Sequence, residues 1–200
     1  MGKRRLDKAL AKLDRSKIDV RVRWHPFELD SDLPRDGSLL KLDRYKQKFG
    51  EKRVKEMLPA MIRTGEEEGI RFSYGGYIGS TFDSHRLLFY VREQDKDNGE
   101  KKQNQLIDLL FRASFEQEED LSDHRVLVRM AGQLAFDEQQ IQAFLRSDRF
   151  NDEVRREIDE NRKRGITGVP HFRLNDRLEL SGARSPEEFL HAFQSIGVYP

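Results

Sequence analysis

The stretch that decides the fold of this chain is Gly165-Ile166-Thr167-Gly168-Val169-Pro170-His171-Phe172. Two glycines indicate a turn, and a valine followed by proline opens a segment in which apolar and polar residues alternate. The pattern predicts strands over 170–174 and 177–180, joined at Asn175-Asp176, a pair typical of a tight hairpin. Ser185-Pro186-Glu187-Glu188 then starts the last helix, with serine at the cap and Glu188 placed for a capping box. The carboxyl end therefore reads as strand, strand, helix.

The amino-terminal part predicts one helix and one strand. Over residues 2–13 the apolar residues recur with helical spacing. Over residues 18–29 apolar and charged residues alternate, which predicts a strand with one buried face that ends near Pro26. Residues 41–164 have helical spacing, with helix starts at Ser80 or Thr81, where Asp83 would complete a capping box, and at Asp137. We expect an α/β core formed by residues 1–40 and 165–200, interrupted by a helical insertion over 41–164.

Composition excludes several classes of protein. The 37 lysines and arginines nearly balance 36 aspartates and glutamates, so the charge gives no argument for nucleic acid or an anionic membrane. No segment approaches the roughly 18 consecutive apolar residues of a membrane-spanning helix, and residues 1–14 do not resemble a secretory signal, so we expect a cytoplasmic protein. The chain has no cysteine and therefore no disulfide, thiolate or cysteine metal site. Its histidines show no metal-ligand spacing, and we expect no metal.

The order of these elements and five short motifs resemble the DsbA-like branch of the thioredoxin fold, in which a helical domain interrupts the core. Within that branch the chain is most similar to the FrnE-type disulfide oxidoreductases, which are relatives of the glutathione-dependent 2-hydroxychromene-2-carboxylate isomerases. The motifs follow the order of the family along nearly the whole chain. They are GKRRL at 2–6, WHPFEL at 24–29, STFDSHRL at 80–87, GITGVPHF at 165–172 and LSGA at 180–183.

The resemblance implies that a first strand and a Cys-x-x-Cys segment come directly before the helix at Gly2. Met1 stands at that place, so we expect this chain to lack both the first strand and the catalytic cysteines. The loss of a central strand would leave two backbone edges without ladder partners. Three explanations stay open: a truncated reading frame, a redox-inactive paralogue that binds without catalysing, and a sheet that is rearranged or completed by another chain.

The resemblance also implies a substrate site at Pro170, which in the family is a cis proline preceded by a residue whose backbone pairs with a peptide. Val169 and His171 would flank this groove. His85 would help to frame a cleft as in the isomerases, although a partly exposed helix histidine is the simpler interpretation. The glycine-rich residues 75–79 precede a helix whose amino end suits an anion such as a glutathione carboxylate, although a plain turn is again simpler.

Three functions stay open at this point. The family activity is thiol–disulfide exchange on unfolded or disulfide-containing proteins, and we expect this chain to be inactive in it because the sulfur atoms are missing. The second is a glutathione-dependent isomerase or transferase acting on small aromatic substrates. The third is a non-catalytic peptide-binding or chaperone-like module that uses the Pro170 groove. The sequence leaves open whether the chain forms a dimer.

Overall fold

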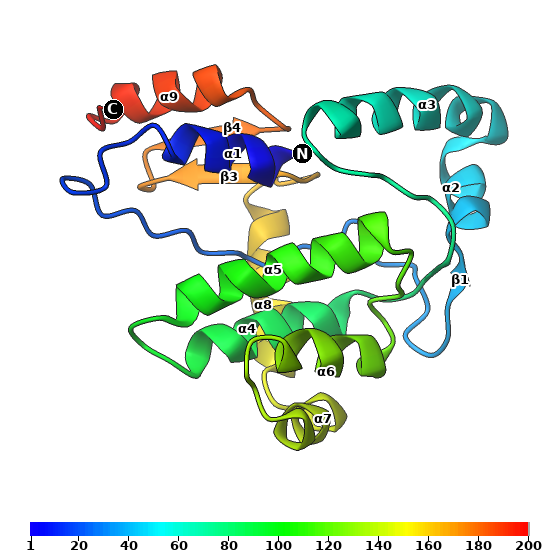
Figure 1. Ribbon diagram of the computed structural model, residues 1–200. Helices are drawn as coiled ribbons and strands as arrows, with labels where there is room; N and C mark the ends of the chain where they lie inside the picture. The colour runs from blue at the N-terminus through cyan, green and yellow to red at the C-terminus, as the bar shows by residue number, and fades with distance from the viewer. Residues whose placement is uncertain (200) are drawn as a thin grey trace.

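The computed structural model describes residues 1–199 (Figure 1). Helix dominates, and the residues predicted as helical between 41 and 164 contain most of it. The helices are α1 (Gly2–Leu10), α2 (Lys41–Phe49), α3 (Glu51–Glu67), α4 (Phe82–Glu93), α5 (Gly99–Glu116), α6 (His124–Gly132), α7 (Glu138–Arg146), α8 (Asn151–Lys163) and α9 (Pro186–Ser195). The strands are β1 (Leu39–Leu40), β2 (Tyr77–Ile78), β3 (His171–Leu174) and β4 (Leu178–Ser181).

The carboxyl-terminal hairpin and helix confirm the prediction. β3 and β4 pair antiparallel, with His171 opposite Ser181. Asn175 and Asp176 have φ angles of 49° and 55°, the left-handed conformation that a tight hairpin turn requires. At the start of α9 the Ser185 hydroxyl accepts from the Glu188 N–H, and the Glu188 carboxylate accepts from the Ser185 N–H. This is the capping box expected from the sequence.

Helices α1 and α9 lie side by side over the β3–β4 hairpin and share an apolar core with it (Figure 1). The ring of Phe172 from β3 meets the fully buried Phe189 edge-on, with ring centroids 4.8 Å apart. Leu174 and Leu180 pack against the same core. The buried members of this core come from both ends of the chain, so these ends fold against each other: Leu6, Ala9, Leu13, Phe189 and Phe193.

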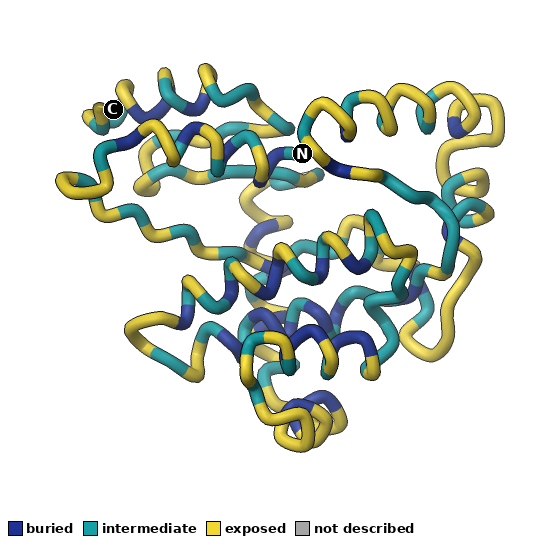
Figure 2. The backbone as a smooth tube through the Cα atoms, viewed as in Figure 1, coloured by how far each residue is buried: buried dark blue, intermediate teal, exposed yellow. Residues whose placement is uncertain are grey.

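The predicted strand over residues 18–29 is wrong. This segment is extended but forms no ladder in the described part of the chain. Its alternation is nevertheless real: Ile18, Val20 and Val22 turn inward onto the α1–α9 core, and the charged residues between them face solvent (Figure 2). Apolar alternation reports which face of an extended segment is buried. It does not report whether a neighbouring strand is present to accept its backbone hydrogen bonds.

Side chains hold the backbone of this extended segment in place of a neighbouring strand. The buried side chain of Gln103 on α5 accepts from the Trp24 N–H (2.9 Å) and donates to the Trp24 carbonyl (3.0 Å), as a paired strand would. Asn161 on α8 donates to the Pro26 carbonyl (3.1 Å). The indole ring of Trp24 then packs edge-on against Phe111.

The helical part has its own apolar cores. Helices α4, α5, α6 and α7 enclose one, whose fully buried side chains include Leu87, Leu106, Leu127 and Ile141. Helix α8 joins α4 through Phe82, Val154 and Ile158. In residues 1–199 no helix is long and apolar enough to cross a membrane.

Helices α2 and α3 form an arm beside these cores (Figure 1). The arm begins at a two-residue ladder in which Leu39 lies opposite Ile78. This ladder was not predicted from the sequence, because two residues are too few to show alternation. The buried Lys41 anchors the arm to α5 by donating to the Ser114 carbonyl (2.8 Å).

Replacing Gln103 by leucine should leave the Trp24 N–H and carbonyl groups buried without partners. We expect Gln103→Leu to lower the free energy of unfolding by about 1–3 kcal/mol, measured by urea denaturation. Gln105 lies exposed on the same helix, so Gln105→Leu is the matched control and should change stability little. Equal stability of the two variants would show that Gln103 does not hold the extended segment.

Candidate functional site at the amino end of helix α1

Three other segments converge on the amino end of α1: the start of β3, the end of β4 and the carboxyl end of α3 (Figure 1). Arg5 joins them, because its Nε donates to Glu68 (2.6 Å) and its Nη1 donates to the Ala183 carbonyl (2.7 Å). Lys8 forms a second ion pair with Glu68 (2.7 Å). Charge-assisted bonds of this kind are stronger than neutral ones and fix the geometry of the convergence.

Pro170 rests directly on Gly2. A Cβ atom built on Gly2 would lie 2.7 Å from Pro170 Cγ and 3.3 Å from Phe172 Cζ, so a larger residue at position 2 would force the two segments apart. The Val169–Pro170 peptide bond is cis, as the resemblance implied. Gly2 is buried, whereas Val169 is 49% exposed. The proline therefore faces the helix, and the valine before it faces solvent.

The backbone of β3 has an open edge beside this proline. The Gly182 N–H donates to the Pro170 carbonyl (2.8 Å), so these two residues form a bonded pair. In an antiparallel ladder, hydrogen-bonded pairs alternate with pairs that share no hydrogen bond. His171 and Arg173 belong to the second kind, so their N–H and carbonyl groups point away from β4. Within residues 1–199 these groups form no hydrogen bond. An extended backbone could pair with this edge from Val169 onward.

The side chain of His171 lies on the face of the hairpin opposite Phe172. Its Nδ1 is 3.1 Å from the Ser181 hydroxyl, and its buried Nε2 is 3.4 Å from Glu179 Oε2 without a hydrogen bond. The ring is thus enclosed between β3 and β4 side chains. His171 offers its backbone, not its imidazole, to the edge next to Val169.

Glu68 is the acidic group of this region. Burial alone would raise the pKa of its carboxyl, but hydrogen bonds and attraction from Lys8 and Arg5 outweigh burial and lower the pKa. The carboxylate therefore stays ionised and paired. Its role is to hold α1 against the end of α3.

The structure does not bring His85 to the same place. His85 lies on α4, where its Nε2 is 3.5 Å from the Thr81 hydroxyl and the ring bonds to the backbone of Phe27. Burial lowers the pKa of His85 to about 4, and the Phe27 bond only partly opposes this. In the described residues no hydrogen bond or ion pair links it to Val169, Pro170 or His171.

The glycine-rich residues 75–79 use their amides within the protein. The Gly75 N–H donates to Glu118 (3.2 Å), and the Gly79 N–H donates to Asp120 (3.2 Å). A Cβ atom on Gly76 would lie 2.3 Å from the Glu118 carbonyl oxygen, so the backbone itself fits closely here. The carboxylates that meet these amides are the chain's own.

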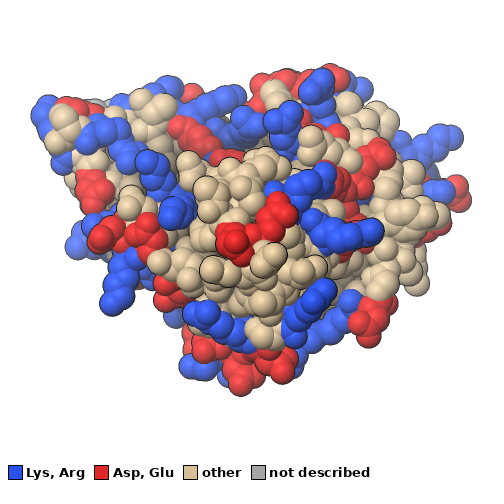
Figure 3. Space-filling view, turned by 60° about the horizontal axis from the view of Figure 1, so that its bottom comes forward, with Lys and Arg blue, Asp and Glu red and all other residues tan. Residues whose placement is uncertain are grey.

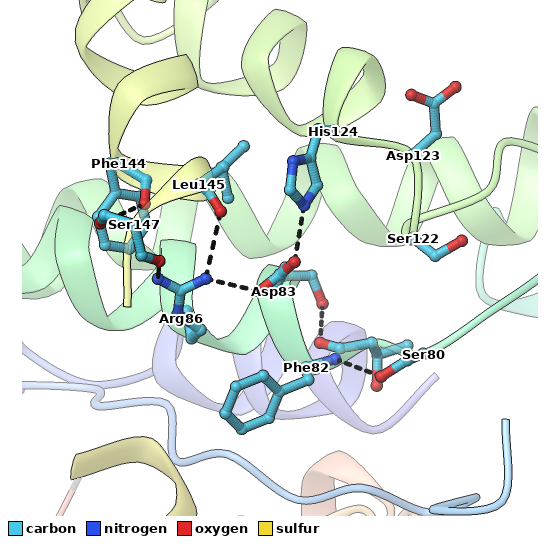
Figure 4. A network of polar contacts seen from close by, with 12 residues as sticks. Ser80, Phe82, Asp83, Arg86, Ser122, Asp123, His124, Phe144, Leu145 and Ser147 are labelled. Carbon is cyan, nitrogen blue, oxygen red and sulfur yellow. Dashed lines mark hydrogen bonds and ion pairs between the residues drawn. The ribbon is translucent and has the colours of Figure 1, made fainter. Parts of the chain in front are cut away.

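Sequence reasoning missed a network of polar contacts around the buried Arg86 on α4 (Figure 4). Arg86, only 3% exposed, donates to Asp83 (2.7 Å) and to the carbonyls of Ser147 and Arg149. His124 from α6 meets the second oxygen of Asp83 at 2.7 Å. The expected capping box at Asp83 is therefore wrong: its carboxylate turns to Arg86 and His124, and the Ser80 hydroxyl accepts from the Phe82 N–H instead. The network fastens α4 to α6 and to the loop before α8.

The remaining histidines serve other contacts. His25 pairs with Glu157 on α8, and His191 is exposed on α9. In residues 1–199 no group of three or more acidic or histidine side chains is placed to bind a metal ion.

Two concavities lie away from the predicted residues. One, of about 500 Å³, lies between β4 and α9, and the other, of about 550 Å³, lies between α6 and α7. Neither is lined by Val169, Pro170, His171 or His85. On the face seen in Figure 3 acidic and basic side chains are interspersed, with no field of one sign. The site at Pro170 is thus an exposed strand edge and not a pocket.

The comparisons with known proteins agree with this geometry. The fold and the proline at the amino end of α1 define a thioredoxin-like protein. The model of the DSBA-like thioredoxin domain matches residues 1–194, and the chain belongs to this family. Among curated proteins no relative matches the chain.

Two solved structures resemble this one. A probable DsbA oxidoreductase from Streptomyces coelicolor is 30% identical, with a TM-score of 0.85 over 100% of this chain and 85% of that one. A 2-hydroxychromene-2-carboxylate isomerase is 13% identical, with a TM-score of 0.62 over 97% of this chain and 88% of that one. The first likeness supports the family, and the second shows a shared fold alone.

A methyl group on Gly2 should push Pro170 and Phe172 away from α1. We expect Gly2→Ala to lower the free energy of unfolding by about 1–3 kcal/mol, the usual cost of overpacking, measured by chemical denaturation. Gly168→Ala is the control, since a Cβ there meets nothing within 4 Å. If both variants are as stable as the parent, the contact does not fasten the hairpin to α1.

Stability should fall in acid through His85. The folded state holds this pKa at about 4, below the ordinary 6.5, so the unfolded chain binds the proton first as pH falls. The stability that the folded protein gains by keeping His85 neutral is complete above pH 6.5 and is lost as the pH falls to 4. Over this range the free energy of unfolding changes by up to about 1.4 kcal/mol per pH unit. Denaturation midpoints measured at pH 7, 5.5 and 4.5 should fall less steeply with pH for His85→Gln than for the parent protein. His191→Gln changes an exposed histidine and should follow the parent. If His85→Gln also follows the parent, the loss of stability in acid does not come from His85.

Proposed function

We propose that this chain binds extended segments of unfolded proteins at the open edge of β3 beside Pro170, without exchanging disulfides itself. The observation that carries the proposal is the exposed Val169, followed by backbone groups of His171 and Arg173 that have no hydrogen-bond partner in the described residues 1–199. An extended polypeptide adds to such an edge through main-chain hydrogen bonds, and neighbouring side-chain contacts supply preference. Membership of the DsbA-like family supports a protein partner, since its relative is named an oxidoreductase of the DsbA type.

The expectation that this chain does not exchange disulfides follows from what thiol–disulfide exchange requires. Thiol–disulfide exchange needs a thiolate to attack a disulfide and a second sulfur to accept the bond. The 200 residues contain no cysteine to supply either. We expect insulin reduction by dithiothreitol to proceed at the buffer rate when the pure chain is added, and turnover above that rate would overturn this half of the proposal.

The shape of the site favours a polypeptide over a small aromatic substrate. The concavities lie away from Val169 and His85, and the Gly75 and Gly79 amides already donate to carboxylates of the chain. A glutathione-dependent isomerase would need a pocket and an anion site at these places. Glutathione titrated into the chain should therefore give no heat of binding. The FrnE-type assignment and a cytoplasmic location remain predictions.

Binding can be measured with reduced, carboxymethylated α-lactalbumin, a chain that stays unfolded. We expect Val169→Gln to weaken binding about tenfold, because burying a valine contributes about 1.5 kcal/mol or more. Tyr199 is 66% exposed near the carboxyl end, so Tyr199→Gln serves as the control and should bind as the parent does. Binding of the parent that Val169→Gln leaves unchanged would remove the Pro170 edge from the proposal.

A further inference from the structure

The extended segment 18–23 and strand β3 border the same apolar core. Val20 and Val22 of the segment pack against the core that α1 and α9 share, and so do Phe172 and Leu174 of β3. Each of these four side chains is only half-buried. The inward side chains of neighbouring strands share one face of a sheet, so the segment and β3 lie on this core as two strands of one sheet would. Within residues 1–199 they nevertheless form no ladder with each other.

One row of backbone groups along the segment has no partner. The Trp24 N–H and carbonyl turn to Gln103 of α5, and the Pro26 carbonyl, two residues further on, turns to α8. In an extended chain the N–H and carbonyl groups of successive residues point to opposite sides. The backbone groups of Arg21 and Arg23 therefore point away from these helices. In the described part of the chain these groups form no hydrogen bond.

The side away from α5 is the side of β3. Figure 1 shows the segment running between α5 and the β3–β4 hairpin, in agreement with its bonds to Gln103 and its packing on the core beneath α1. On β3 the backbone groups of His171 and Arg173 also have no hydrogen-bond partner within residues 1–199. Two rows of unpaired backbone groups thus border the space between the segment and β3.

We propose that a bound polypeptide enters between segment 18–23 and β3 as one added strand and pairs with both. The inference deepens the proposed function and rests on it, because it turns pairing at β3 alone into pairing on two sides. Every second side chain of the added strand then faces the α1–α9 core beside Val20 and Phe172. The segments bound best are therefore those in which apolar and polar residues alternate.

The opposite face of this layer does not select the charge of the partner. Each exposed arginine on that face is already paired with an acidic side chain: Arg21 with Asp19, Arg23 with Glu100, and Arg173 with Asp176. The partner is therefore recognised by a free backbone and by the alternation of its residues.

A second copy of this chain fits the place less well than an unfolded polypeptide. A strand between two neighbours needs both of its edges free. Strands β3 and β4 already use one edge each on the other, and Trp24 uses its backbone groups on α5. In the extended residues 70–74 the Ser73 N–H donates to the Phe115 carbonyl. An unfolded polypeptide has both edges free.

Hydrogen–deuterium exchange of the whole chain, with and without reduced and carboxymethylated α-lactalbumin, tests both sides at once. In a saturated complex the Arg21 and Arg23 amides should slow about tenfold or more, together with those of His171 and Arg173. The Val22 amide points to the α5 side and should change less than about twofold. Slowing at His171 and Arg173 without Arg21 and Arg23 would overturn the two-sided site and leave the proposed function standing. Slowing at neither β3 amide would overturn both.

A proline in the segment tests the same bonds by binding. Arg21→Pro removes an N–H that the free protein leaves unbonded, so stability should match the parent while binding of labelled α-lactalbumin weakens about fivefold. Arg21→Gln removes the same charge, keeps the N–H and should bind within about twofold of the parent. Urea denaturation establishes the stability of both variants. Parent-like binding by Arg21→Pro, or equal weakening in the two variants, would overturn the added strand.

Short peptides test the alternation. A peptide in which valine and glutamine alternate should displace labelled α-lactalbumin at a concentration about tenfold below that of a peptide with the same residues in two blocks. Equal displacement would overturn the preference for alternating segments. Sedimentation of the protein alone as a dimer, with the Arg21 and His171 amides already slow, would assign the place to a second copy and overturn the proposal.

Discussion

The contact between Gly2 and Pro170 is the constraint on which the rest of this structure depends. It brings the carboxyl-terminal hairpin against the first turn of α1 with no room for a side chain at position 2. From that point Phe172 reaches the core shared by α1 and α9, and Arg5 reaches the end of α3. The same contact leaves Val169 exposed at the start of an unpaired backbone edge. Fold and candidate site thus follow from one close approach.

Backbone hydrogen bonding explains the unusual features around this contact. Extended segments need partners for their N–H and carbonyl groups, and an unmet group in the interior costs about 1–3 kcal/mol. On one side of the core the protein meets this need with the side chains of Gln103 and Asn161. On the other side, the backbone groups of His171 and Arg173 that face away from β4 find no partner within residues 1–199. That difference separates a structural segment from a surface able to bind another chain.

Much of this could be predicted from sequence where the signal is local. The Asn175-Asp176 turn and the capping box at Ser185 depend on residues within a few positions of each other, and both formed as expected. The strand over 18–29 failed because a ladder depends on a distant neighbour, which alternation does not encode. The Asp83–His124 pair joins residues from two helices, and no spacing rule along the chain would have found it. At the site, the proline could be located from its motif, whereas the position of the His171 ring beside Ser181 and Glu179 of β4 came only from the fold.

The central claim is that an unfolded polypeptide pairs with the β3 edge from Val169 onward. Hydrogen–deuterium exchange at single-residue resolution, with and without reduced and carboxymethylated α-lactalbumin, tests it most directly. The account predicts that the His171 and Arg173 amides exchange more slowly in the complex, because main-chain hydrogen bonds to the added strand protect them. Unchanged exchange at these two amides in a saturated complex would contradict it.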